Sequence, residues 1–269
     1  MDSISGIILG VVQGVTEFLP VSSSGHLILM HAFLEAEDST SLAFDAVLQL
    51  ATALAVVVYF WNEIQVLIQT VLRKLSRLPV NPRNFALVQG LLIGTIPAVI
   101  VGIFLEPLME TLFRSPLLVA GVLVAGSVFF MFAEYRYQNS FHTTEVDVHT
   151  GLKVGLFQIL ALVPGFSRSG ATIAGGMLLG MHRSEAARFS FLLAIPIILG
   201  SGGKKLIELM LSDGSVAWTP LVAGAVMAFG VGILAIHFMI SFVRKHTLMP
   251  FAWYRIILAC FVVFVTVFG

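Results

Sequence analysis

Long apolar runs, separated by short polar segments, follow one another along the whole chain. Six of them reach or approach the length of about 20 residues that a helix needs to cross the hydrocarbon core of a bilayer. These runs cover approximately residues 42–61, 85–105, 116–135, 186–205, 217–243 and 250–268. The pattern therefore predicts six membrane-spanning helices.

Two further apolar stretches, at about residues 4–34 and 152–181, are interrupted near the middle by polar residues together with Pro and Gly. The first interruption reads E-F-L-P-V-S-S-S-G-H (Glu17–His26) and the second reads P-G-F-S-R-S-G-A-T (Pro164–Thr172). A broken helix at membrane depth is tolerated only where its backbone is buried in protein or lines a polar cavity. We therefore expect two re-entrant helical hairpins whose tips carry the functional groups.

The two halves of the chain are related by one constant offset of 145 residues. This offset aligns identical residues inside both interrupted stretches and beyond them: Gly10 with Gly155, Gln13 with Gln158, Ser22 with Ser167, Ser24 with Ser169, Gly25 with Gly170, Phe44 with Phe189, Leu48 with Leu193 and Glu63 with Glu208. Each half, about 1–140 and 141–269, then contains one hairpin and three spans. Because an odd number of crossings inverts the second half, the predicted fold is an all-α polytopic membrane protein: a single domain made of two inverted-topology repeats.

The composition agrees with a membrane protein and excludes several other classes. Hydrophobic residues make up 58% of the chain, charged residues only 11%, and the mean hydropathy is +0.97. Soluble domains contain roughly 25% charged residues. The formal net charge is zero, so no basic face indicates nucleic-acid binding, and the single cysteine, Cys260, excludes a disulfide or a cysteine-based metal site within one chain.

Positive charge predicts the orientation. Lys and Arg gather at residues 73–83, 136–188 and 244–245, which the six-span prediction places on one side of the membrane. Short loops rich in Lys and Arg stay in the cytoplasm. Lys204 and Lys205 fall on the opposite side and weaken the asymmetry. With this orientation the first hairpin enters from the outer face and the second from the inner face, and their tips meet near the midplane.

The first motif contains residue types suited to nucleophilic catalysis. Gln13 and Glu17 are four residues apart and share one face of a helix, and His26 is expected to open the half-helix that follows the break. Ser23 and His26 are three residues apart, which can bring a hydroxyl nucleophile close to a general base. Glu17 can orient that base or hold a cation. Helix capping is the alternative role for Ser22, Ser23 and Ser24, and a structural core histidine is the alternative for His26.

The second motif is typical of an anion site. Ser167, Arg168 and Ser169 follow a Pro-Gly pair, and a half-helix is expected to start near Thr172. Helix N-termini attract anions, and a guanidinium group matches the geometry of phosphate oxygens. The alternative is that Arg168 pairs with Glu17 only to hold the two halves together. Either role would place both motifs at one site.

The segments V-Q-G-V-T-E-F-L-P-V-S-S-S-G-H and P-G-F-S-R-S-G-A-T resemble the two signature motifs of the undecaprenyl-diphosphate phosphatase, or bacitracin-resistance, family. The resemblance covers essentially the whole chain. It implies hydrolysis of undecaprenyl diphosphate to undecaprenyl phosphate, the lipid carrier recycled for cell-wall polymers, at a cleft facing the outer side of the bacterial inner membrane. It also implies dependence on a divalent cation, Mg²⁺ or Ca²⁺.

Carried onto this chain, the resemblance makes Glu17, Ser23, His26 and Arg168 the catalytic residues. The remaining site residues would bind the substrate phosphates: Ser22, Ser24, Ser167, Ser169 and Thr172. Glu17 and Gln13 would hold the cation, although a glutamine at position 13 supplies no second negative charge. The implied partners are a polyprenyl diphosphate and the bilayer, without nucleic acid, and a homodimer is left open.

The motifs and the resemblance together predict a membrane phosphatase. In this prediction Ser23 attacks the terminal phosphorus, His26 takes its proton, and Arg168, the helix starts and a cation stabilise the phosphoryl charge. Attack by His26 itself, or by a water that it activates, stays open. The alternative function is a transporter or lipid flippase for polyprenyl phosphate or another anionic lipid, because broken helices in inverted repeats are also typical of transporters.

Overall fold

The computed structural model describes residues 2–34, 41–111, 115–138, 146–211 and 217–268, and within these ranges every regular element is a helix. In chain order the helices are α1 (Ser3–Phe18), α2 (Ser23–Phe33), α3 (Ser41–Tyr59), α4 (Trp61–Leu75), α5 (Pro82–Thr111), α6 (Pro116–Gln138), α7 (Val148–Gln158), the 3₁₀ turn η2 (Ile159–Leu162), α8 (Arg168–Leu178), α9 (Arg183–Leu211), α10 (Trp218–Val243) and α11 (Met249–Phe268).

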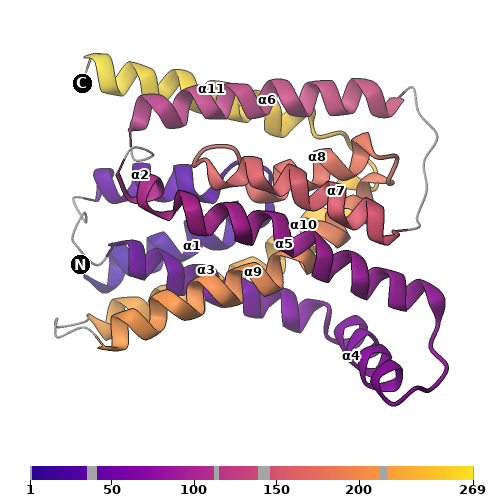
Figure 1. Ribbon diagram of the computed structural model, residues 1–269. Coiled ribbons are helices and arrows are strands. Elements are labelled where there is room, and N and C mark those ends of the chain that lie inside the picture. The colour runs from indigo at the N-terminus through magenta and orange to yellow at the C-terminus, as the bar shows by residue number, and fades with distance from the viewer. Residues whose placement is uncertain (1, 35–40, 112–114, 139–145, 212–216, 269) are drawn as a thin grey trace.

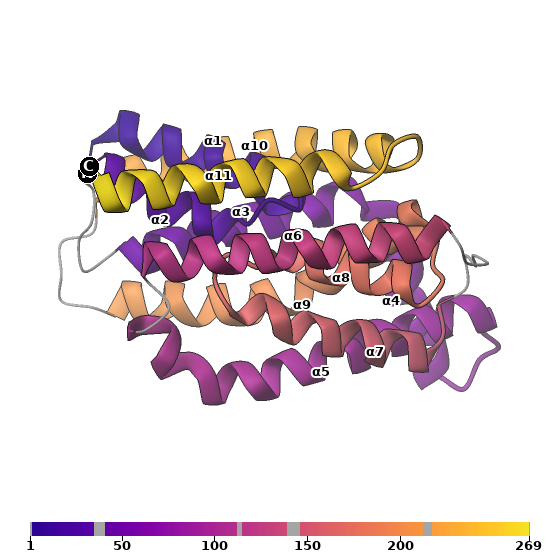
Figure 2. The same cartoon turned by 90° about the horizontal axis from the view of Figure 1, so that it is seen from above.

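Most of these helices run side by side along one direction (Figure 1). Helices α6 and α11 form a pair on one side of the molecule, and both chain termini lie at the same end. The view from above shows α1 beside α10 and α5 beside α7 (Figure 2). Helix α1 opens the first interrupted stretch and α7 opens the second, so each stretch packs against one of the long helices.

Five of the described helices, α5, α6, α9, α10 and α11, are long and apolar enough to cross a membrane. A sixth crossing results if α3 and α4, which are bent by 82° at their junction, count as one span. For the part of the chain that it describes, the structure thus confirms an all-helical fold with five to six candidate spans. The predicted span over residues 42–61 corresponds to α3.

Helix α4 was not predicted as a separate element. It begins at Trp61, turns sharply away from α3, and carries Arg73 and Lys74 in its last turn. Its large exposed apolar side chains include Trp61, Ile68, Leu72 and Leu75. The apolar sequence continues through the bend, which is why hydropathy alone did not separate α4 from α3.

The two interrupted stretches form helical hairpins that enter the molecule from opposite ends (Figure 1). One consists of α1 and α2, and the other of α7, η2 and α8. Both second helices begin earlier than predicted, α2 at Ser23 instead of His26 and α8 at Arg168 instead of near Thr172. The reason is that the serine just before each start caps the helix through its side chain, so the helix needs no later cap.

Glycines allow each hairpin to pack closely on a neighbouring long helix. A Cβ atom at Gly10 of α1 would lie 2.1 Å from the carbonyl oxygen of Gly224 in α10, and a Cβ atom at Gly155 of α7 would lie 2.2 Å from that of Gly94 in α5. Such distances exclude any side chain. Small residues at these positions therefore fix how α1 and α7 lie against the helices that hold them.

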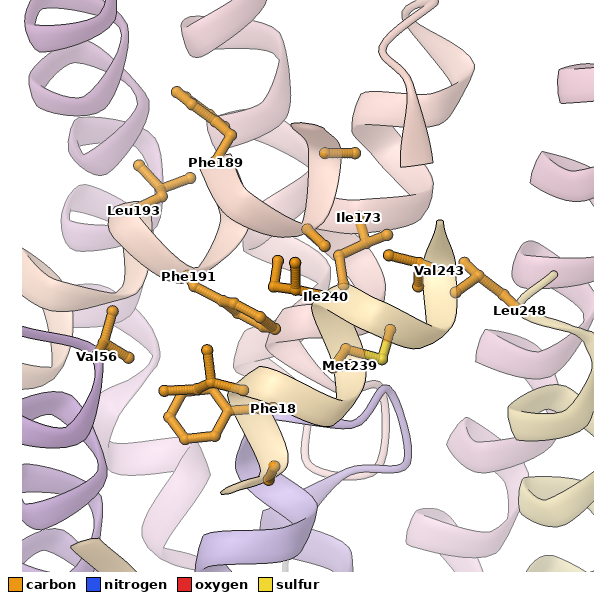
Figure 3. Packing of buried hydrophobic residues seen from close by; sticks show 14 of the residues in the cluster. Phe18, Val56, Ile173, Phe189, Phe191, Leu193, Met239, Ile240, Val243 and Leu248 are labelled. Atoms are coloured by element: carbon orange, nitrogen blue, oxygen red, sulfur yellow. The ribbon is translucent and has the colours of Figure 1, made fainter. Parts of the chain in front are cut away.

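A core of aromatic and aliphatic side chains surrounds the end of α1 and connects it to α9 and α10 (Figure 3). Phe18, the last residue of α1, packs edge-to-face on Phe191 of α9 with ring centroids 5.3 Å apart. Ile173 of α8 and Met239 of α10 belong to the same cluster. This packing holds the first break in place from one side.

Glu134, near the end of α6, is a buried carboxylate. Its carboxylate receives hydrogen bonds from Nε and Nη2 of Arg183 at 2.6 to 3.2 Å and from the backbone N–H of Leu248 at 2.6 Å. These contacts connect α6 to the start of α9 and to the residue just before α11. Glu134 thereby joins three of the long helices at the end opposite the termini.

Candidate active site

The two breaks use the same local structure. Ser22 and Ser167 both adopt positive φ angles, 74° and 78°, and each side-chain oxygen accepts a hydrogen bond from the backbone N–H three residues later. A serine hydroxyl two residues beyond each cap lies within hydrogen-bond distance of it, Ser24 at 3.4 Å and Ser169 at 3.2 Å. Non-glycine residues at positive φ cost on the order of 1–3 kcal/mol and persist where surrounding contacts enforce them.

The tips of the two hairpins meet. Arg168 Nη2, at the start of α8, donates to Glu17 Oε1 near the end of α1 at 2.6 Å. Ser169 Oγ donates to the backbone carbonyl of Leu19 in the first break at 3.2 Å. The structure therefore brings together two motifs that are about 150 residues apart in the chain. It also contains the Glu17–Arg168 ion pair on which the alternative, structural role of Arg168 rests.

Glu17 is the centre of the polar contacts at the site. In addition to Arg168 on Oε1, its Oε2 accepts hydrogen bonds from Ser23 Oγ at 2.8 Å and from Gln13 Nε2 at 3.0 Å. The residue is only 7% exposed. Three donors around one carboxylate suit its ionised form, which accepts hydrogen bonds only. A carboxylate in this position can receive the proton of the Ser23 hydroxyl.

Among the described hydrogen bonds, Ser23 and His26 have other partners than each other, so these bonds do not support the predicted pairing. His26 Nδ1 lies 2.7 Å from the carbonyl oxygen of Ser22, and Nε2 lies 2.7 Å from the hydroxyl of Tyr254. Ser23 turns instead toward Glu17. The spacing of three residues did not predict this, because Ser23 is the first residue of α2 and its side chain reaches back across the break, whereas the imidazole folds onto the carbonyl of the cap.

Arg168 is held from a second side by α9. Its Nη1 donates to the carbonyl oxygen of Ser190 at 3.3 Å. The hydroxyl of Ser190 lies 2.6 Å from that of Thr172, which also donates to the backbone carbonyl of Arg168 at 2.8 Å. Ser190 and Thr172 are completely buried. Sequence reasoning missed Ser190, which lies in an ordinary apolar span without any motif around it.

Arg255 of α11 was also missed, and it is the largest completely buried side chain. Its guanidinium donates to the carbonyl oxygens of Pro20 in the first break, of Gly165 and Phe166 in the second, and of Leu123 in α6, at 2.8 to 3.4 Å. The same group lies over the ring of Phe130. Arg255 could have been found from the sequence, because it is a single arginine inside the apolar run 250–268.

The residues proposed for a cation offer only part of a coordination sphere. Among the described residues there is no group of three or more His, Cys, Asp or Glu side chains that could hold a metal. Glu17 supplies one carboxylate, and the buried side-chain oxygen of Gln13 has no hydrogen-bond partner. This donor set fits a hard cation such as Mg²⁺ that takes most of its remaining ligands from phosphate oxygens and water.

Comparison with known proteins identifies one family whose members resemble this chain over nearly its whole length. A family model described as bacitracin resistance protein BacA matches residues 6–261. The chain is 42% identical over 263 residues to an undecaprenyl-diphosphatase of Moorella thermoacetica, covering 98% of this chain and 97% of that protein. It is 41% identical over 261 residues to an undecaprenyl-diphosphatase of Trichlorobacter lovleyi (95% and 94% covered) and 36% identical over 266 residues to one of Enterococcus faecalis (97% and 95% covered). The chain belongs to the bacitracin resistance protein BacA family.

Proposed function

We propose that this protein is an undecaprenyl-diphosphatase, a multi-pass membrane enzyme that hydrolyses undecaprenyl diphosphate to undecaprenyl phosphate and phosphate. The relatives that carry this name match the chain over nearly its full length. The reaction recycles the lipid carrier for cell-wall synthesis, and it accounts for the bacitracin resistance after which the family is described. The observation that carries the proposal is the hydrogen bond from Ser23 to Glu17, whose other carboxylate oxygen binds Arg168 of the opposite hairpin.

These contacts support a two-step hydrolysis. The Ser23 oxygen forms a bond to the terminal phosphorus, the bond from phosphorus to the bridging oxygen breaks, and Glu17 takes the Ser23 proton and passes it to the departing undecaprenyl phosphate. Water then splits the phosphoserine: His26 takes a proton from this water through Nε2, the water's OH stays on the phosphate, and His26 returns a proton to the Ser23 oxygen. Holding nucleophile, carboxylate and arginine in one place supplies positioning and charge stabilisation, the two main contributions to phosphoryl transfer.

Arg168 is placed to stabilise the phosphoryl group. In the structure its Nη2 is occupied by Glu17, and a phosphate oxygen can take over this donor because a guanidinium binds carboxylate and phosphate in the same way. The carbonyl of Ser190 keeps Nη1 in place during that exchange. Glu17, released from the arginine, is then available as the base for Ser23.

The hydroxyl groups assigned to phosphate binding divide into two sets by burial. Ser22, Ser167, Ser169 and Thr172 are buried and bonded within or between the breaks. Their contacts favour a role in shaping the breaks. Ser24, at the start of α2, is partly exposed. We therefore assign phosphate contact to Ser24, to the helix starts and to Arg168.

A divalent cation, Mg²⁺ or Ca²⁺, would be held by Glu17 and by the unpartnered oxygen of Gln13. When bound, it would neutralise part of the negative charge of the diphosphate. The chain's own contribution is to hold Gln13 against Glu17 through the hydrogen bond from Nε2.

The proposed setting is the bacterial cytoplasmic membrane, with the site reached from the outer side. The Lys and Arg distribution supports it, because α4, α6 and α10 end on the side of the molecule opposite the termini (Figure 1). In the chain, Arg77, Arg136, Arg244 and Lys245 lie at or just beyond these helix ends. Two inverted repeats, each with a re-entrant hairpin, account for the opposite directions of the hairpins and for their matching serine caps. No part of the mechanism depends on a second copy of the chain.

The transporter alternative is not favoured. At the offset of 145 residues, the second-half counterparts of Glu17, Ser23 and His26 are Leu162, Arg168 and Ala171. The carboxylate, the hydroxyl and the imidazole thus belong to one hairpin only, with the arginine on the other. This division of roles suits a nucleophile facing a phosphate-binding group.

Phosphate release in detergent separates the two functions, because transport needs two compartments and hydrolysis does not. The purified protein in detergent micelles, supplied with undecaprenyl diphosphate and Mg²⁺ or Ca²⁺, is expected to release inorganic phosphate and leave undecaprenyl phosphate. A folded protein that binds the lipid but releases no phosphate with either cation would contradict the proposal.

A further inference from the structure

Tyr254 of α11 contacts the site from outside both hairpins. Its hydroxyl lies 2.7 Å from Nε2 of His26, and the two rings are stacked nearly parallel, with an interplanar angle of 4° and centroids 5.7 Å apart. The two residues are 228 positions apart in the chain. Neither motif contains Tyr254, so this contact is available only from the folded structure.

The hydrogen bonds of His26 define the role of each ring nitrogen. The carbonyl oxygen of Ser22 can only accept, so Nδ1 carries a proton. Nε2 is then the nitrogen that gains or loses a proton during a reaction, and the Tyr254 hydroxyl is the group bonded to it. In the neutral imidazole Nε2 accepts a hydrogen bond from that hydroxyl.

The two ends of the imidazole also differ in their surroundings. Ser22, on the Nδ1 side, is 1% exposed, whereas Tyr254, on the Nε2 side, is 44% exposed. The tyrosine therefore lies at the surface of the molecule, on the Nε2 side of His26. Any proton that His26 exchanges with a bound substrate passes through Nε2, beside the Tyr254 hydroxyl.

We propose that Tyr254 is a positioning residue of this site, whose hydroxyl holds the His26 imidazole with Nε2 on its more exposed side. The inference rests on the proposed phosphatase function and extends it to a residue of the last helix. In metal sites, groups that orient a metal-bound histidine typically contribute 10- to 100-fold to metal affinity or activity. Tyr254 would act through His26 in a similar way.

The chain offers a matched control in a second tyrosine–histidine pair. The hydroxyl of Tyr59, in α3, lies 3.1 Å from Nδ1 of His237 in α10. The rings of Tyr59 and His237 are tilted by 58° to each other, and their centroids are 6.2 Å apart. Neither residue contacts Glu17, Ser23, His26 or Arg168 among the described hydrogen bonds. Tyr59→Phe therefore removes the same group from the same kind of pair away from the site.

The experiment compares Tyr254→Phe with Tyr59→Phe in detergent, using undecaprenyl diphosphate as substrate. We expect Tyr254→Phe to keep its ring packing and melting temperature, to lower kcat by about tenfold, and to leave KM within about twofold of wild type, because the phosphate contacts of Arg168 and the helix starts are unchanged. Tyr59→Phe is expected to match wild type. A Tyr254→Phe variant with wild-type kcat would overturn the inference.

A spectroscopic readout tests the contact independently of activity. In protein labelled with ¹⁵N-histidine, the His26 resonances are identified by their loss in His26→Gln. Tyr254→Phe is expected to shift the Nε2 resonance of His26, and Tyr59→Phe is expected to leave it in place. If wild-type protein released no phosphate, the proposed function would fail. The comparison of the two NMR spectra would still show whether Tyr254 contacts His26. An unmoved Nε2 resonance in Tyr254→Phe would contradict it.

A tyrosine analogue covers the case in which Tyr254→Phe is unstable in detergent. Fluorotyrosine at position 254 alone keeps the ring and the hydroxyl but makes the phenol a stronger donor. We expect the Nε2 resonance of His26 to move in that protein too. The same resonance position as in wild type would refute the positioning role.

Discussion

Glu17 receives hydrogen bonds from three different helices: from Gln13 within α1, from Ser23 of α2 and from Arg168 of α8. Each donor holds the carboxylate in the geometry that the other two need. Because Glu17 is buried and Arg168 is only 14% exposed, removing either partner leaves a largely uncompensated charge, which costs up to about 3–5 kcal/mol for a fully buried pair. The proposed catalytic arrangement and the contact between the hairpins therefore depend on the same side chains.

Arg168→Lys separates positive charge from guanidinium geometry. A lysine has one ammonium group and cannot donate to Glu17 and to the Ser190 carbonyl in the fixed directions that Arg168 uses. We expect kcat for phosphate release to fall by about 100-fold, the usual effect of losing one positioned donor, in protein that still folds. Arg77→Lys, in the exposed turn after α4, is the matched control and is expected to keep full activity. Near-normal turnover of Arg168→Lys would show that the arginine is only structural.

The residues that sequence reasoning found and missed at the site differ in how visible they are along the chain. Polar interruptions of apolar stretches contain Glu17, Ser23, His26 and Arg168. These residues stand out in the sequence because a polar or charged side chain is unfavourable in the hydrocarbon core of a membrane. Arg255 was equally conspicuous as a charge in an apolar run. Tyr254 and Ser190 were not, because their polar atoms face the site only through the packing of α11 and α9, which no local pattern encodes.

At the scale of elements, the broken helices were predictable and the bent one was not. Pro20 in the first break, and Pro164 with Gly165 in the second, cannot continue a helix without loss, and Gly165 has a positive φ of 101°. The end of α3 carries no such signal, since the apolar sequence runs on through Phe60 and Trp61. Only the 82° bend shows that α4 is a separate helix.

The bend and the side chains of α4 are typical of a helix that lies in the membrane surface. Its exposed apolar residues Ile68, Leu72 and Leu75 recur at helical spacing, and Arg73 and Lys74 are exposed beside them. Helices of this kind bury an apolar face at the boundary between headgroups and acyl chains. Arg188 of α9, hydrogen-bonded to Glu63, attaches α4 to the rest of the molecule.

Spin-label depth measurements distinguish a surface helix from a crossing one. Labels at Ile68 and Leu75, introduced as cysteines in a Cys260→Ser background, are expected to report the same membrane depth within a few ångströms. A helix running across the bilayer would separate them by about 10 Å, at 1.5 Å per residue. Leu54 and Val58 on α3 serve as the reference pair and are expected to differ in depth. A steady change in depth along α4 would show that it continues the span.

At the scale of the whole molecule, the orientation decides from which side the lipid diphosphate reaches the site. The expectation that the 73–83 segment is cytoplasmic rests on the Lys and Arg distribution. Single cysteines at positions 77 and 110, again in a Cys260→Ser background, are expected to react with a membrane-impermeant thiol reagent from opposite sides. In intact cells only position 110 is expected to react, and labelling of position 77 from outside would reverse the orientation.

The central claim is that the two breaks form one phosphatase site with Ser23 as its nucleophile. The most direct test is the rate of phosphate release by purified Ser23→Ala, measured beside Ser22→Ala and His26→Ala. We expect Ser23→Ala to fall below about one thousandth of the wild-type rate while it still binds a non-hydrolysable analogue, because Arg168 and the helix starts remain. Ser22→Ala is expected to be milder, since losing a helix cap costs about 1 kcal/mol. Substantial turnover by Ser23→Ala, together with none by His26→Ala, would contradict the account and assign the attack to His26 or to a water that it activates.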